Sequence, residues 1–201
     1  GDGYAIGMGH FMHAFKKNAS FLYIVMNNET YGLTKGQASP TSQVGFEGNV
    51  ENPFDAILTA LSIPAPNFIA RTFSGDPKQM TQILVEGLKF NRENRGFAFV
   101  EALSPCVTYN DTYKEWRAKV VDVSKLPGYD PTDRSKTFEL CLKTMDEGKI
   151  PIGVMHRPRS ASSEAQSLEL KLLPDRTGPA VAEIGMAPNR VAYEKLLRAL
   201  A

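Results

Sequence analysis

A short apolar run, residues 20–26, stops abruptly at Asn27 and Asn28, and this break constrains the fold more than any other feature of the chain. A run of this length that ends at polar turn residues is typical of a buried strand. In a parallel sheet, ligands bind beyond the carboxyl ends of the strands. Two carboxamides delivered there offer hard oxygen ligands. The run therefore predicts a buried parallel strand that ends at a metal or phosphate site.

Helical and extended patterns alternate along the rest of the chain. Asn52 and Asp76 are the expected N-caps of the second and third helices. Short apolar strands that alternate with helices predict an α/β fold: a mostly parallel sheet with helices on both faces. Helices are predicted at 7–17, 53–61, 77–94 and 132–147, strands at 20–26, 68–73 and 97–103, a further apolar run at 150–155, and a loosely patterned polar segment at 109–123.

The chain opens with a glycine-rich stretch, Gly1-Asp2-Gly3 followed by Gly7 and Gly9, directly before the first predicted helix. Small residues let the backbone approach a diphosphate, and the helix N-terminus offers free N–H groups and a favourable dipole. The spacing differs from the G-x-G-x-x-G of dinucleotide-binding folds, and no ribose-binding acid follows at a strand end. The stretch therefore favours a diphosphate ligand other than NAD.

Charge and cysteine content exclude several classes of function. The net charge is +1, from 23 basic and 22 acidic side chains, which gives no footprint for nucleic acid or an anionic membrane. No apolar run reaches the length of a membrane span, so we expect a cytoplasmic protein. Cys106 and Cys141 are too few for a zinc site or a disulfide framework. Cys141 lies in a helical apolar pattern and is expected in the core.

The glycine turn followed by a strand that ends in Asn-Asn resembles the thiamine-diphosphate motif. Residues 28–41, NETYGLTKGQASPT, together with Gly7–Ala14 and Leu103–Cys106, resemble the β subunit of 2-oxoacid:ferredoxin oxidoreductases. The resemblance covers residues 1 to about 158. It implies oxidative decarboxylation of a 2-oxoacid, with 2-oxoglutarate favoured, using coenzyme A and reducing ferredoxin. It also implies an α subunit as partner.

The resemblance further implies three cofactors: thiamine diphosphate, Mg2+ and a 4Fe-4S cluster. No catalytic residue is assigned to this chain. The implied roles are Mg2+ binding by the Asn28 side chain and the Thr30 carbonyl, cofactor contact by Gly1, Asp2, Gly32 and Leu33, binding of a substrate carboxylate by Lys35, and cluster ligation by Cys106.

One departure from the family pattern concerns the first residues. The family usually reads GDGDG and uses the first Asp as the Mg2+ ligand, whereas the spacing to Asn28 makes Asp2 the second one. We therefore expect a fragment truncated within this motif, with an Asp before Gly1 and three cluster cysteines further upstream. The expected divisions are a cofactor-binding domain at 1–106, a C-terminal extension at 107–158, and a tail at 159–201 with a terminal amphipathic helix.

Two other functions stay open from the residues alone. A non-redox thiamine-diphosphate lyase would share the cofactor motif and lack the cluster cysteines. A non-catalytic α/β module that binds a nucleotide or another subunit would bind no thiamine diphosphate. Of the three histidines, His10 and His13 are expected to be structural or adjacent to the cofactor, and His156 is expected at the surface or an interface.

Overall fold

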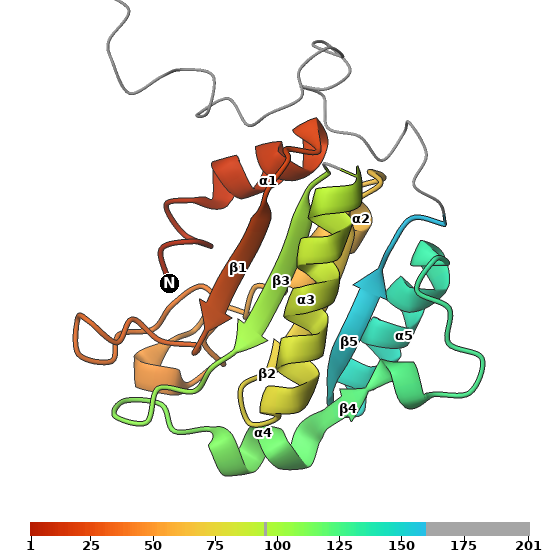
Figure 1. Ribbon diagram of the computed structural model, residues 1–201. Helices are drawn as coiled ribbons and strands as arrows, with labels where there is room; N and C mark the ends of the chain where they lie inside the picture. The colour runs from red at the N-terminus through yellow and green to blue at the C-terminus, as the bar shows by residue number, and fades with distance from the viewer. Residues whose placement is uncertain (95, 160–201) are drawn as a thin grey trace, which may run out of the picture.

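The computed structural model describes residues 1–94 and 96–159, and its strands form one five-stranded sheet in the order β1-β3-β2-β5-β4 (Figure 1). β1, β3 and β2 run parallel, β5 is antiparallel to β2, and β4 is parallel to β5. The predicted α/β fold with a mostly parallel sheet is confirmed. The strands are β1 (Leu22–Asn27), β2 (Phe68–Phe73), β3 (Ala98–Leu103), β4 (Val120–Asp122) and β5 (Ile150–His156).

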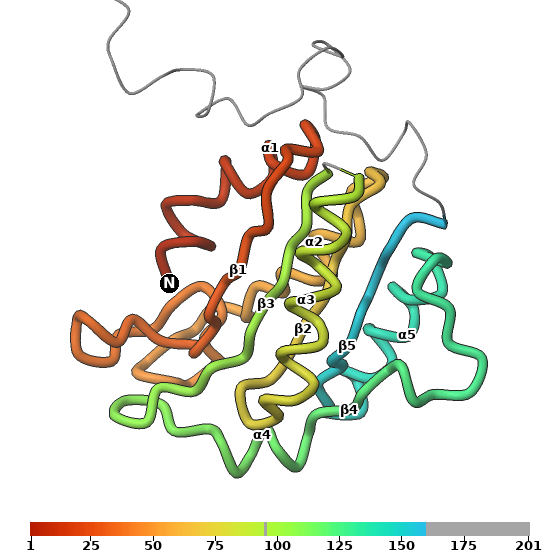
Figure 2. Tube along the Cα trace, in the orientation of Figure 1, coloured from red at the N-terminus to blue at the C-terminus, as the bar shows by residue number. Residues whose placement is uncertain are grey.

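Helices cover both faces of the sheet, as the sequence predicts (Figures 1 and 2). α1, α2 and α5 contribute buried residues to one core, and α3 packs on the opposite face against β2 and β3. The elements are α1 (Met8–Lys17), η1 (Phe46–Gly48), α2 (Ala56–Ser62), α3 (Pro77–Asn94), α4 (Tyr113–Lys119), η2 (Val123–Lys125) and α5 (Arg134–Asp146). No described helix is both long and apolar enough to cross a membrane.

Aromatic packing fixes α1, and with it the glycine turn that precedes this helix. Phe11 and Phe15 are one helical turn apart, so both side chains point to the sheet. The Phe11 ring lies 5.0 Å from the Phe99 ring and the Phe15 ring lies 4.7 Å from the Phe97 ring, both edge to face. Burying each phenylalanine contributes roughly 2 to 3 kcal/mol. The start of the chain is thereby held beside β1.

Two helix starts show what local signals can and cannot locate. α3 begins at the predicted residue, and the Asp76 carboxylate accepts a hydrogen bond from the Gln79 N–H at 3.1 Å. The prediction for α2 is wrong: this helix begins at Ala56, and Asp55 rather than Asn52 is its N-cap, accepting from the Leu58 N–H at 2.7 Å. The other carboxylate oxygen of Asp55 forms an ion pair with a strand residue, described below.

Residues 109–123 contain α4 and β4, although the sequence predicts only a loosely patterned segment. A single large apolar side chain anchors α4, because Trp116 packs in a small core with Phe73, Leu103 and Ile152. One buried residue in a seven-residue helix leaves no recognisable periodicity.

Residues 107–158 complete the sheet of the first part rather than forming a separate layer, because β5 pairs with β2. Arg134 of α5 also binds the end of α2, donating to the carbonyls of Ala60 at 3.4 Å and Leu61 at 3.3 Å, and to those of Ile63 and Ala65. Burial lowers the pKa of Arg134 to about 10. The tail expected at 159–201, with its terminal helix, lies outside the described residues except for residue 159.

The expectation for His156 is wrong, because this side chain is only 6% exposed. Its Nδ1 atom lies 3.1 Å from the Pro131 carbonyl oxygen. Burial, together with the nearby Arg134 charge, lowers the pKa of His156 to about 4. The ring is therefore neutral at pH 7. His156 ends a strand covered by α5, which a lone histidine in the sequence cannot reveal.

The other side chains singled out above lie as follows. His10 and His13 are exposed on α1. Cys141 is buried, as expected, with its Sγ 3.9 Å from the Met155 Sδ, and burial raises the pKa of its thiol to about 11. This thiol is an inert part of the core at neutral pH.

Candidate functional site

The carboxyl ends of the three parallel strands lie at one end of the sheet, and the start of the chain lies alongside β1 (Figure 2). A Cβ atom on Gly3 would lie 2.7 Å from the Tyr23 hydroxyl, and one on Gly1 would lie 2.4 Å from the Tyr31 ring. Real Cβ atoms do not tolerate such distances. A larger residue at either position would therefore require the Tyr23 or Tyr31 side chain to move.

The two asparagines at the end of β1, Asn27 and Asn28, turn the chain by hydrogen-bonding the backbone that follows them. Asn27 Oδ1 accepts from the Glu29 N–H and Asn28 Oδ1 accepts from the Thr30 N–H, each at 3.1 Å. Glu29 has a φ of 54°, in the left-handed region. The pattern is that of consecutive Asx-turns, which the carboxamides make possible.

This turn leaves oxygen atoms suited to a hard cation. The Asn28 carboxamide is half-buried and its oxygen keeps a second lone pair. Thr30 is 2% exposed, and no donor in the described part of the chain hydrogen-bonds to its carbonyl. A buried carbonyl without a donor is uncommon. Mg2+ prefers oxygen ligands of this kind, so the residues fit the predicted ion.

The following segment closes on itself as a tight loop. The Tyr31 N–H donates to the Gln37 carbonyl at 2.9 Å, and the Gly36 N–H donates to the Tyr31 carbonyl at 3.0 Å. Lys35 adopts a φ of 71° and its side chain is exposed. Leu33 is fully exposed, at 100%. The loop thus presents one apolar and one cationic side chain to solvent.

Cys106 follows the end of β3 and lies against the same loop. A Cβ atom on Gly32 would lie 3.6 Å from the Cys106 Sγ, and Asn110 donates to the Asn28 carbonyl at 3.0 Å. The thiol is free and half-buried. Within residues 1–94 and 96–159, no group of three or more His, Cys, Asp or Glu side chains could hold a metal ion. Among the described residues, Cys106 is thus a single thiol at this strand end, beside the amide oxygen of Asn28 and the carbonyl of Thr30.

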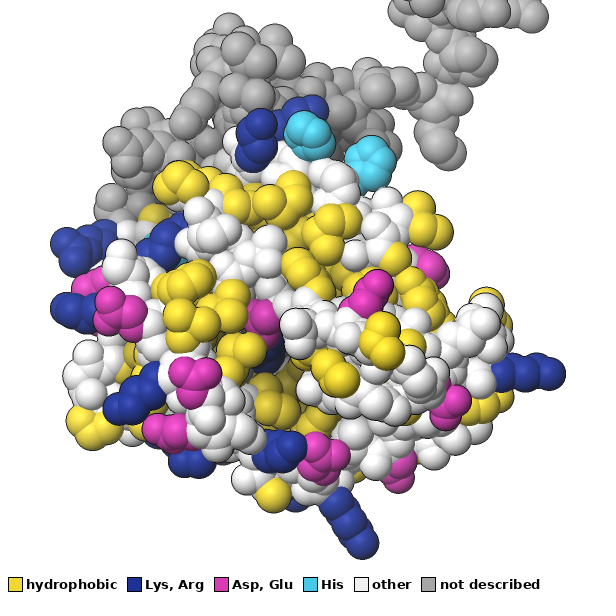
Figure 3. Space-filling model, turned by 180° about the vertical axis from the view of Figure 1, so that it is seen from behind, with side chains coloured by type: hydrophobic (Ala, Val, Ile, Leu, Met, Phe, Trp, Pro, Cys, Tyr) yellow, Lys and Arg dark blue, Asp and Glu magenta, His cyan; other side chains and the backbone are white. Residues whose placement is uncertain are grey.

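A pocket of about 470 Å3 opens on the face of the sheet that α2 covers, at the carboxyl ends of the same strands. Seen from behind, this face of the molecule is hollowed near its centre (Figure 3). Its walls include Phe46, Phe54, Trp116 and Ile150. None of the site residues predicted from the sequence lines this pocket.

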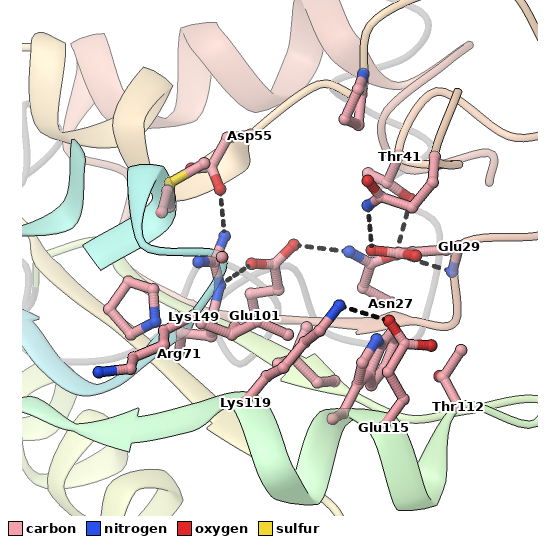
Figure 4. Close-up of a pocket in the computed structure, with 18 of the residues that line it drawn as sticks. Asn27, Glu29, Thr41, Asp55, Arg71, Glu101, Thr112, Glu115, Lys119 and Lys149 are labelled. Atoms are coloured by element: carbon pink, nitrogen blue, oxygen red, sulfur yellow. Dashed lines mark hydrogen bonds and ion pairs between the residues drawn. The ribbon is translucent and has the colours of Figure 1, made fainter. Parts of the chain in front are cut away.

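Charged side chains in this pocket form a chain of contacts (Figure 4). Arg71 of β2 pairs with Asp55 through Nη2 at 2.6 Å and with Glu101 of β3 through Nε at 2.6 Å. Although burial opposes ionisation, the Arg71 guanidinium holds the pKa of Asp55 below its ordinary value. Burial raises the pKa of Glu29 to about 7, and the Gln43 amide donates to its carboxylate at 3.1 Å.

These charges were not predicted from the sequence, although a signal for them exists. Arg71 and Glu101 are the lone charged residues in the apolar strands FIARTF and AFVEAL, and they are direct neighbours in the β2–β3 register. Of the predicted residues, the structure brings together Gly1, the loop after Asn28, and Cys106. Asp2, Leu33 and Lys35 stand at the surface.

Comparison with known proteins agrees with this geometry. Residues 1–102 match the family model of the thiamine pyrophosphate enzyme C-terminal TPP-binding domain, and residues 106–171 match that of the C-terminal part of the β subunit of pyruvate ferredoxin oxidoreductase. The chain is 34% identical over 183 residues to the 2-oxoacid:ferredoxin oxidoreductase β subunit of Saccharolobus solfataricus, covering 84% of this chain and 58% of that protein. It is 35% identical over 159 residues to 2-oxoglutarate synthase subunit KorB of Methanothermobacter marburgensis, covering 76% and 53%.

A solved structure shares the fold. It is the 2-oxoglutarate:ferredoxin oxidoreductase from Magnetococcus marinus with 2-oxoglutarate, coenzyme A and succinyl-CoA bound. The TM-score is 0.69 at 30% identity, with 92% of this chain and 63% of that chain covered. The present chain thus spans little more than half the length of the curated relatives given above.

The fold and the turn at the end of β1 define the thiamine-diphosphate-binding domain of a thiamine pyrophosphate enzyme. Within that class, the chain belongs to the β subunits of 2-oxoacid:ferredoxin oxidoreductases, which confirms the resemblance seen in the sequence.

Proposed function

We propose that this chain is the cofactor-binding part of an enzyme that oxidatively decarboxylates a 2-oxoacid, with 2-oxoglutarate favoured, forms an acyl-coenzyme A and reduces ferredoxin. The observation that carries the proposal is the turn after β1, which leaves the Asn28 amide oxygen and the buried Thr30 carbonyl as ligands beside the glycine turn. The name of the KorB relative and the ligands of the solved neighbour support 2-oxoglutarate and coenzyme A.

In this proposal the chain's own residues bind and orient the cofactor. Asn28 and Thr30 would hold Mg2+, and Gly1, Asp2, Gly32 and Leu33 would contact the cofactor. Thiamine diphosphate, when bound, supplies the carbanion-stabilising chemistry that decarboxylation needs. Lys35 receives a substrate carboxylate, which suits its exposed position beside the loop.

Cys106 is proposed as one thiolate ligand of a 4Fe-4S cluster, because its free thiol lies at a strand end next to Gly32. A cluster at this point would lie beside the cofactor loop, as electron transfer to ferredoxin requires. An α subunit and ferredoxin are the proposed protein partners, and the cytoplasm is the proposed location. The division into a cofactor domain ending near residue 106 and an extension is proposed on the same basis.

Thiamine diphosphate titration of the complete enzyme, with and without Mg2+, tests the proposal. We expect Mg2+-dependent binding, a Kd raised about 10- to 100-fold or more in Asn28→Ala, and an unchanged Kd in the exposed loop control Asn52→Ala. Absence of binding in the unsubstituted enzyme would leave the non-catalytic binding module as the better function. Binding without any iron-sulfur absorption would favour the non-redox lyase.

A further inference from the structure

A buried carboxylate joins the two halves of the proposed cofactor site. Glu101 lies in the middle of β3 and is 1% exposed. Its Oε1 atom accepts hydrogen bonds from the Tyr4 hydroxyl at 3.1 Å and from the Asn27 Nδ2 at 3.0 Å, and its Oε2 atom accepts from the Arg71 Nε at 2.6 Å. Figure 4 shows Glu101 between Arg71 and Asn27.

The two groups that donate to Oε1 belong to the two segments that, in the proposed function, lie on either side of the cofactor diphosphate. Tyr4 directly follows the turn Gly1-Asp2-Gly3, and Asn27 directly precedes Asn28. The Tyr4 ring is 2% exposed and packs edge to face on Phe54 with the centroids 5.4 Å apart. The hydroxyl therefore has a fixed direction, and one carboxylate oxygen fixes the separation of the two segments.

Asn27 passes this restraint on to the loop beyond it. Its Oδ1 accepts from the Thr41 hydroxyl at 2.8 Å as well as from the Glu29 N–H, while its Nδ2 is held by Glu101. Both ends of the carboxamide are thus used. A substitution at Glu101 or Tyr4 should therefore shift Asn27, and with it the adjacent Asn28, even though neither substituted residue is a proposed ligand.

Stability alone is a weak reason for this arrangement. A buried ion pair recovers its desolvation cost only with good geometry, and apolar replacements of similar volume are often no less stable. The surroundings of Glu101 on β3 are apolar, with Phe99 and Leu103 on the same face. A buried polar network in which every group is hydrogen-bonded fixes one geometry, even where it adds little to the free energy of unfolding.

We propose that Glu101 is a positioning residue, which holds the Gly1–Gly3 turn and Asn28 at the separation that thiamine diphosphate with Mg2+ requires. The inference rests on the proposed function. Glu101 is not among the proposed cofactor or metal ligands, and in this proposal it acts through its hydrogen bonds to Tyr4 and Asn27. Removing one of these hydrogen bonds lowers the fraction of the protein in the arrangement that binds the cofactor. The apparent Kd for thiamine diphosphate then rises by the same factor.

Tyr4→Phe is the sharpest test, because it removes one hydroxyl and keeps the ring packing. The matched control is Tyr129→Phe, since the Tyr129 hydroxyl donates to the Val154 carbonyl at 2.6 Å, far from the cofactor turn in the sequence and in a different network. The measurements on the complete enzyme are the thiamine diphosphate Kd at saturating Mg2+, the melting temperature, and kcat at saturating cofactor.

We expect Tyr4→Phe to raise the Kd about tenfold, with kcat at saturating cofactor within about twofold of the unsubstituted enzyme. Tyr129→Phe should lower the melting temperature to a similar extent and leave the Kd within about twofold. A Kd within twofold in Tyr4→Phe, or an equal rise in both variants, would overturn the positioning role and leave the proposed function standing.

A second variant measures the coupling. In a Glu101→Leu background, Tyr4→Phe should change the Kd by less than about twofold, because its acceptor is already gone. A full tenfold effect in that background would show that Tyr4 acts without Glu101, and would refute the proposal. If Glu101→Leu does not fold, the comparison of Tyr4→Phe with Tyr129→Phe decides alone. Failure of the unsubstituted enzyme to bind thiamine diphosphate would instead defeat the proposed function.

Discussion

His156 should make the apoprotein sensitive to mild acid. The folded state holds this ring neutral, with a pKa of about 4, whereas the unfolded chain gives it a usual pKa of 6.5. Because the pKa is lower in the folded state, the unfolded state binds more protons as the pH falls. The contribution of His156 to stability is complete above about pH 6.5 and is lost as the pH falls toward 4.

The magnitude follows from the two pKa values. Between pH 7 and pH 5, the difference in proton binding removes about 2 kcal/mol from the free energy of unfolding. Glu29 acts in the opposite direction, because its raised pKa of about 7 lets the folded state bind a proton over the same interval. The pH dependence of the unfolding free energy of this protein alone therefore cannot isolate His156. A comparison with a variant that lacks the His156 ring can.

His156→Asn keeps a hydrogen-bond donor for the Pro131 carbonyl and removes the titrating ring. Urea unfolding of the apoprotein at pH 7, 6 and 5 gives the difference in free energy of unfolding between the two proteins. We expect this difference to shift by about 2 kcal/mol in favour of the variant between pH 7 and pH 5, whatever its value at pH 7. A difference that stays constant over this interval would refute the inference that burial keeps His156 neutral.

Three further predictions concern the proposed ligands and the α2–α5 contact. In the complete enzyme, Cys106→Ala should abolish or strongly reduce iron content and visible absorption, whereas Cys141→Ala should leave both intact; unchanged iron in Cys106→Ala would remove the cluster assignment. Lys35→Ala should lower kcat/KM for 2-oxoglutarate about ten- to a hundredfold and affect pyruvate much less, and an equal fall for both substrates would give Lys35 no role in specificity. Arg134→Ala should lower the free energy of unfolding by about 2 kcal/mol in thermal denaturation, because it deprives several carbonyls of a donor, while the exposed neighbour Lys136→Ala should change it by less than about 0.5 kcal/mol; equal effects would contradict the capping role.

The sequence alone determined the features that depend on local chemistry. The apolar runs located β2 to the residue and β1 and β3 to within two residues at their starts, and Asp76 located the start of α3. The glycine turn and the Asn27-Asn28 strand end indicated a diphosphate and metal site. These signals survive without tertiary context because a run of apolar residues, a capping carboxylate and a turn-forming carboxamide each act on their immediate neighbours.

Only the tertiary structure decided what depends on partners distant in the chain. Asp55, which caps α2 in place of Asn52, is paired with Arg71 of β2, and Trp116 anchors α4 where the periodicity is absent. Glu101 becomes the centre of a network because the sheet register places it beside Arg71, while α1 and β1 bring Tyr4 and Asn27 to it. Burying an unpaired charge costs several kcal/mol, so a charged residue is tolerated in the core only where partners pair with it. Those partners lie far apart in the sequence, and local sequence patterns therefore do not reveal them.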